Sequence, residues 1–130
     1  MRPDQTSNSD SQSFSTTDVA RPWGSFRVLS RGEGFLIKRL VIAPNARLSL
    51  QYHRWRSEHW IVLHGTARAT VEDREVTLTG DESVFVAARA IHRLANPTSE
   101  LLHLIEVQTG WRLLDDDIVR LDDDYGRVSE

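Results

Sequence analysis

The residues best suited to chemistry gather in segment 51–60, QYHRWRSEHW, with one more histidine far downstream. Gln51 and His53 are two positions apart, so on a strand their side chains point to the same side. A turn at 54–57 can bring Glu58, at the start of the next strand, back opposite them, and His92 opens another short strand. These four side chains, carried on three neighbouring strands, can converge on one point. Nitrogen and oxygen ligands in this mixture suit zinc, manganese, cobalt, nickel or iron.

Any one of these residues is a weak signal, because a single histidine is more often an ordinary polar or core residue than a ligand. The joint pattern is stronger: a histidine and a glutamate open a strand pair, a glycine turn follows at Gly65, and His92 comes 34 residues after Glu58. The chain has no cysteine, which excludes disulfides, thiolate ligands and a cysteine nucleophile.

Two further charged residues stand in apolar surroundings. Lys38 lies in the run FLIKRLVIA, and if Leu36 and Leu40 face inward, Lys38 faces inward with them and needs an anionic partner. That partner is either a substrate phosphate or Glu106, which lies in a similarly apolar run. Burial raises the pKa of a carboxyl group, so Glu106 is a candidate general base, with a structural ion pair as the alternative.

The elements that must position these side chains are short strands. Turn signals recur every eight to twelve residues, at Gly32 and Gly34, 44–45, Gly65, 72–73, 80–81 and 96–97, which is typical of an all-β sandwich or closed barrel. No sustained helical period precedes the C-terminus. The expected strands are SFRVLS, GFLIKRLVIA, RLSLQYH, HWIVLHG, ARATVE, REVTLTG, SVFVAA, HRLANP and LLHLIEVQTG.

Alternation in residues 47–53, RLSLQYH, separates an apolar face from a polar one that carries Gln51 and His53. In an ordinary sandwich the polar face would meet solvent. In a small open-mouthed barrel it can instead line a pocket.

The chain of 130 residues fits one domain. Residues 1–20 are rich in Ser, Thr, Asn, Gln and Asp and are expected to form a flexible polar tail, with an arm packed on a neighbouring subunit as the alternative. The domain then spans 21–127. The acidic end, DDDIVRLDDDYGRVSE, is expected to form a helical turn or a docked extension, and its charges to form a solvated face.

A net charge of −3 without a basic stripe argues against nucleic acid or an anionic membrane as partner. The apolar runs are far shorter than the roughly 20 residues that span a bilayer, and no basic-then-apolar leader is visible. We therefore expect a soluble, cytoplasmic protein.

The string QYHRWRSEHWIVLHGTA, together with RPWGSFRVL, IKRLVIAP, IHRLANP, LIEVQTG and DDIVRLDDDYGR, resembles the C-terminal isomerase domain of bifunctional mannose-1-phosphate guanylyltransferase/mannose-6-phosphate isomerases, a branch of the cupins. The resemblance implies a cupin (jelly-roll, double-stranded β-helix) barrel that binds one divalent metal through Gln51, His53, Glu58 and His92. Zinc is the expected ion. It also implies interconversion of mannose 6-phosphate and fructose 6-phosphate. Nucleotide transfer is not expected, because no glycine-rich nucleotide-binding start is present in this chain.

Arg56 matches the arginine of the family's RSEHW segment, which implies a catalytic or phosphate-binding role. His59 follows Glu58, so it should point to the opposite face and be structural. The chain departs from the family at Arg54 and Trp55, where histidines are usual, and at residues 88–90 and 111–112, while the four expected ligands are retained.

The resemblance thus implies a metal-dependent sugar-phosphate isomerase with Arg56, Glu106 and Lys38 as catalytic candidates. The alternatives are a cupin enzyme acting on another substrate, including an oxygenase, and a non-catalytic metal- or sugar-binding module. Because exposed faces of such barrels are commonly buried by pairing, we expect a homodimer, with the N-terminal strand and the acidic extension as candidate contacts.

Overall fold

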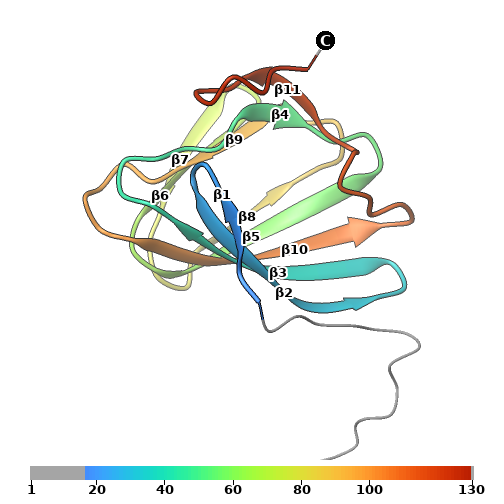
Figure 1. Cartoon of the computed structure of the whole chain (residues 1–130), viewed down its shortest axis with the longest axis horizontal. Coiled ribbons are helices and arrows are strands. Elements are labelled where there is room, and N and C mark those ends of the chain that lie inside the picture. The colour runs from blue at the N-terminus through green and yellow to red at the C-terminus, as the bar shows by residue number, and fades with distance from the viewer. Residues whose placement is uncertain (1–16, 130) are drawn as a thin grey trace, which may run out of the picture.

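The computed structural model describes residues 17–129, which fold into two antiparallel β-sheets without a helix (Figure 1). The six-stranded sheet has the order β1 (Val19–Arg21), β2 (Gly24–Gly32), β3 (Phe35–Ile42), β10 (Leu102–Gly110), β5 (Arg56–His64) and β8 (Ser83–Val86). The five-stranded sheet has the order β11 (Val119–Asp122), β4 (Leu50–Tyr52), β9 (His92–Ala95), β6 (Ala67–Val71) and β7 (Arg74–Leu78).

The inward side of the barrel is apolar at one end and polar at the other. On β5 the buried side chains run from Arg56 and Glu58 to Trp60 and Val62. Strand β10 runs antiparallel beside it and places Glu106 opposite Trp60. The polar halves of the two strands therefore coincide, so that one end of the barrel holds the apolar core and the other a polar interior.

The core joins both sheets and fills the apolar end. Burial of these side chains from water is the main stabilising contribution to such a fold. Its largest fully buried members are Trp60, Ile42, Leu94, Leu102 and Leu104.

The nine predicted strands are all present, and two more occur. Residues 1–16 of the expected polar tail lie outside the described residues, but Val19 and Ala20, which the prediction placed in the tail, pair with β2 in strand β1. The helical turn considered for the C-terminal segment is wrong. That segment is a docked extension, because β11 pairs with β4 and sets Arg120 opposite Gln51. No helix that could cross a membrane occurs within residues 17–129.

Candidate metal centre

Three of the four expected ligands form a compact buried cluster. His53 follows β4, Glu58 lies in β5 and His92 opens β9, and one potential ligand atom of each lies within 4.8 Å of the others. His53 Nε2 is 3.2 Å from Glu58 Oε2, and His92 Nε2 is 3.8 Å from Glu58 Oε1. The polar face of residues 47–53 therefore lines the barrel interior where it carries Gln51 and His53, as the pocket alternative predicted.

Both histidines are held in the tautomer that a metal requires. His53 Nδ1 donates to the carbonyl oxygen of Asp117 at 2.7 Å, and His92 Nδ1 donates to that of Ala90 at 2.8 Å. Their Nε2 atoms face Glu58. This arrangement, with a backbone acceptor orienting each imidazole, is typical of metal-binding histidines.

Glu58 supplies a second sign that the cluster suits a cation. Its Oε1 is buried and has no hydrogen-bond partner within residues 17–129, and an unsatisfied buried acceptor is costly. Burial alone would raise the pKa of Glu58, but the hydrogen bond and charge of His53, with the charges of Arg56 and His92, together hold that pKa well below its usual range. Burial in turn lowers the pKa of His92. A buried carboxylate beside two imidazoles fits a divalent metal.

Gln51 also reaches the cluster, but it presents its amide nitrogen. Gln51 Nε2 lies 3.3 Å from His53 Nε2 and 3.5 Å from His92 Nε2, while its Oε1 accepts a hydrogen bond from Ser49 Oγ. Ligation through oxygen would require the amide to turn over. The structure thus brings the four predicted ligands together, with Gln51 in need of this rearrangement.

Arg56 is buried beside the cluster, and all three of its nitrogens have partners. Its Nε donates to Glu58 Oε2 at 2.9 Å, its Nη1 donates to the carbonyl of Leu114 at 3.3 Å, and its Nη2 lies 3.4 Å from His53 Nε2. These contacts orient Glu58 and place a positive charge at the centre. Because these contacts engage all three nitrogens, Arg56 is poorly placed to bind a phosphate group.

Glu106 lies deeper in the same polar interior. Its Oε1 accepts from Trp60 Nε1 at 3.1 Å and its Oε2 accepts from Gln108 Nε2 at 2.8 Å. Burial, followed by the charge of Glu58, raises the pKa of Glu106, and the charge of Lys38 partly offsets this. A carboxyl group with a raised pKa in a pocket is suited to moving protons.

Lys38 stands opposite Glu106 in the β3–β10 pairing, as expected from its place in the strand. Its Nζ lies 4.2 Å from the centre of the Phe26 ring, a cation–π contact. No ion pair of 4.0 Å or less joins Lys38 to Glu106 in the described part of the chain. Lys38 therefore acts on Glu106 through its charge, from the neighbouring strand.

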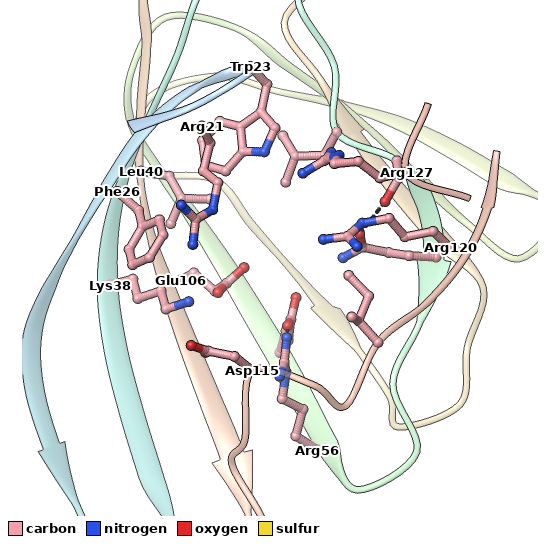
Figure 2. A pocket seen from close by; sticks show the side chains of 15 residues that line it. Arg21, Trp23, Phe26, Lys38, Leu40, Arg56, Glu106, Asp115, Arg120 and Arg127 are labelled. Atoms are coloured by element: carbon pink, nitrogen blue, oxygen red, sulfur yellow. Dashed lines mark hydrogen bonds and ion pairs between the residues drawn. The ribbon is translucent and has the colours of Figure 1, made fainter. Parts of the chain in front are cut away.

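Five of these residues, Gln51, Glu58, Arg56, Glu106 and Lys38, line one pocket of about 690 Å³, a volume that includes space open to solvent (Figure 2). In Figure 2, Arg21 and Lys38 reach in from one side, Arg120 and Arg127 from the other, and Glu106 lies between them. Its charged lining comprises five cationic residues and three acidic ones: Arg21, Lys38, Arg56, Arg120, Arg127, Glu58, Glu106 and Asp115.

Sequence reasoning missed Asp117. It belongs to an acidic run that was expected to be a solvated face, but its carboxylate is buried and accepts the backbone N–H groups of Arg54 and Trp55 at 2.8 and 2.9 Å. It thereby fixes the loop that follows His53, and its backbone carbonyl orients the His53 ring. The only available signal was the family resemblance of the DDIVRLDDDYGR segment, because the composition of the run indicates solvation.

The three departures from the family pattern lie together in space. The Trp55 ring packs edge-on against Trp111 with centroids 5.5 Å apart, and Arg89 lies 5.8 Å from the Trp55 ring. Trp111 is 78% exposed. His59, by contrast, points away from the pocket as predicted, beside Ser83 and Phe85 on the outer face.

A two-sheet antiparallel barrel with histidine and glutamate ligands inside one end defines the chain as a cupin. Solved structures agree on the fold at low sequence identity. The cupin domain of Cnp3 from Schizosaccharomyces pombe matches with a TM-score of 0.67 and 15% identity, over 74% of this chain and 69% of that one. An RmlC-like cupin from Shewanella frigidimarina gives 0.67 and 19%, over 75% and 86%. Bacillus subtilis oxalate decarboxylase gives 0.69 and 16%, over 82% and 30%.

Within this class, the chain belongs to the family described as mannose-6-phosphate isomerase C-terminal, whose model matches residues 8–123. It is 48% identical over 113 residues to the alginate biosynthesis protein AlgA of Pseudomonas aeruginosa, covering 87% of this chain and 24% of AlgA. It is 43% identical over 109 residues to a mannose-1-phosphate guanylyltransferase of Salmonella muenchen, covering 84% of this chain and 23% of the relative. The chain thus spans about a quarter of the length of these relatives.

Proposed function

We propose that this chain is a metal-dependent aldose–ketose isomerase that interconverts mannose 6-phosphate and fructose 6-phosphate, and so serves polysaccharide precursor supply in the cytoplasm. The observation that carries the proposal is a metal-type cluster of His53, Glu58 and His92, whose Glu58 lines a cation-rich pocket together with Glu106, a separate buried acid with a raised pKa. Family membership and relatives named for alginate and xanthan biosynthesis support the choice of sugar.

His53, Glu58 and His92, with Gln51 after its amide turns, would hold the ion, and zinc is the first expectation. A bound divalent metal polarises a carbonyl oxygen and stabilises the charge that develops on it. Arg56 keeps Glu58 oriented and adds positive charge beside it. The hydrogen bonds described above orient the Glu58 carboxylate and the two imidazole rings before substrate binds.

Glu106 is the group we assign to proton movement between C1 and C2. Isomerisation moves one proton between C2 and C1 and a second between the two oxygens on these carbons. A single carboxyl group that accepts and then donates can carry the carbon-bound proton, and the oxygen-bound proton can exchange through water in the solvent-open pocket. The raised pKa of Glu106 favours this exchange near neutral pH. Lys38, on the neighbouring strand, compensates the negative charge of Glu106 when it is ionised.

The test is turnover of mannose 6-phosphate by metal-stripped protein, with zinc, manganese, cobalt and nickel added back separately. We expect at least one ion to restore turnover, and His53→Ala and His92→Ala to abolish both turnover and tight metal binding. His59→Ala is the matched control, because this histidine lies on the outer face and should leave both unchanged.

One local feature gives a reason to keep a second candidate. Trp55, Arg89 and Trp111 stand where the family usually has other residues, and they form one cluster, so another sugar phosphate or a purely binding role is the alternative. Metal bound tightly at His53 and His92 without turnover of mannose 6-phosphate would overturn the proposed reaction and favour that alternative.

A further inference from the structure

The C-terminal extension contributes two arginines to the pocket, and the sequence analysis gave neither of them a role in the site. Arg120 lies on β11 opposite Gln51 of β4, and directly opposed residues of an antiparallel pair project to the same face. Arg127 lies in the segment that follows β11. Both line the pocket, with Arg21 of β1 on the far side (Figure 2).

Arg120 is the cation of this group that lacks a partner. Its Nε is buried and unbonded, and its side chain forms no hydrogen bond or ion pair with any other residue between 17 and 129. A guanidinium N–H that is buried without a hydrogen-bond partner is unfavourable. Burial and the like charges of Arg127 and Arg21 lower the pKa of Arg120, and the charge of Asp123 only partly offsets them.

The other cations of the pocket are already engaged. Arg127 pairs bidentately with Asp123, at 2.8 and 3.0 Å, which fixes its plane and leaves Nη1 outside that pair. Arg56 is committed to Glu58, the Leu114 carbonyl and His53. Lys38 and Arg21 both lie over the Phe26 ring, and Arg21 Nη1 also donates to the carbonyl oxygen of Ala20. Among the arginines of the pocket, Arg120 is therefore the one whose side chain has no hydrogen-bond partner within residues 17–129.

We propose that Arg120, supported by Arg127 and Arg21, binds the phosphate group of the substrate, a phosphate monoester. A planar guanidinium donates two parallel hydrogen bonds to phosphate oxygens, and two further cations nearby suit a dianion better than a single charge. This assignment rests on the proposed function for the identity of the substrate, and it moves phosphate binding away from Arg56 and Lys38. Asp123 is a positioning residue that holds Arg127.

The test compares Arg120→Gln with Arg68→Gln, a matched loss of charge at an exposed position of β6. Binding of inorganic phosphate and of mannose 6-phosphate is measured by calorimetry on the zinc-loaded full chain, together with KM, kcat and metal content. We expect Arg120→Gln to lower the affinity for both ligands by about tenfold to a hundredfold and to raise KM more than it changes kcat. Metal content should stay at the wild-type level, and Arg68→Gln should match wild type throughout.

Arg120→Lys keeps the charge but loses the planar fork, so an intermediate affinity is expected. Arg127→Gln is the second variant, which keeps the test decisive if Arg120→Gln fails to fold. Unchanged phosphate affinity in both Arg120→Gln and Arg127→Gln would overturn the subsite, as would a wild-type protein that binds neither phosphate ligand. If wild type binds phosphate through Arg120 but does not isomerise mannose 6-phosphate, the subsite stands and the proposed reaction fails.

Discussion

Two buried carboxyl groups in one small barrel have pKa values moved in opposite directions. Glu58 is surrounded by His53, Arg56 and His92, which together outweigh the cost of its burial and keep it ionised. Glu106 is bonded to neutral donors from Trp60 and Gln108, so burial raises its pKa. Such a separation distinguishes a permanent anion from a group that exchanges protons, and it supports different roles for the two residues.

The raised pKa of Glu106 has a consequence for stability. The folded state holds the Glu106 proton more tightly than the unfolded chain does, so this contribution to stability is complete below the unfolded pKa. It is lost as the pH rises through the folded pKa. Glutamine resembles the protonated acid at every pH. We therefore expect Glu106→Gln to unfold at the same denaturant concentration as wild type near pH 4 and to become more stable than wild type, by on the order of 1 kcal/mol, towards pH 8.

The measurement is urea unfolding of metal-free protein across this pH range, with isomerase activity followed in parallel on metal-loaded protein. Glu75→Gln, at an exposed position of β7, is the control and should show no such pH-dependent gain. A Glu106→Gln protein that is less stable than wild type at pH 8 would contradict the raised pKa. We expect its isomerase turnover to be lost, because the amide cannot accept a proton.

At the scale of elements, alternation predicts much of the site. Gln51 and His53 share a face because they are two apart on one strand, and Lys38 faces inward because Leu36 and Leu40 do. These inferences need only the period of a strand.

What the sequence could not predict depends on contacts between distant segments. Strand β11 and Asp117 lie in an acidic stretch whose composition indicates solvation, and only docking against β4 and the 54–55 loop buries Asp117. Arg120 reads as an ordinary surface arginine for the same reason. The conversion of such a segment into part of the site is a tertiary effect that local patterns do not contain.

The docked extension should therefore control metal affinity through Asp117. In Asp117→Asn the side-chain oxygen can accept only one backbone N–H well, because the amide NH₂ faces the other donor. The loop that carries His53 loosens, and partners of metal ligands typically contribute about 10- to 100-fold in affinity. We expect a loss of that size in zinc affinity, measured by competition with a chromophoric chelator.

Asp116→Asn is the matched control, since the neighbouring Asp116 is exposed. It should bind zinc as wild type does. Equal affinities in the two variants would show that the Asp117 contacts to Arg54 and Trp55 do not support the metal centre.

At the scale of the whole molecule, the outer face of the six-stranded sheet carries apolar side chains among polar ones. One cross-strand row joins Ile37, Val107, His59 and Phe85, and another joins Arg27, Arg39, Ile105, Ile61 and Ser83. Phe85 is 55% exposed, and Leu63 on the same side of β5 is 48% exposed. Exposed apolar side chains gathered on one sheet face, with polar residues around them, are a typical feature of an interface.

We expect a second copy of the chain to cover this face, giving a homodimer in which the rows of the two sheets pack on each other. A lysine introduced at Ile105, in the central strand β10, would bury an unpaired charge in such an interface and favour monomers. Leu121→Lys is the control, because Leu121 is 44% exposed on the C-terminal extension and not on the six-stranded sheet. Light scattering at micromolar concentration should give a dimer for wild type and Leu121→Lys and a monomer for Ile105→Lys, with metal binding retained in all three as evidence of folding.

The opposite pattern would assign the contact to the extension, and a monomeric wild type would exclude the dimer. Because the face lies on the far side of the sheet from Glu58 and Glu106, a monomeric Ile105→Lys protein should still bind phosphate through Arg120.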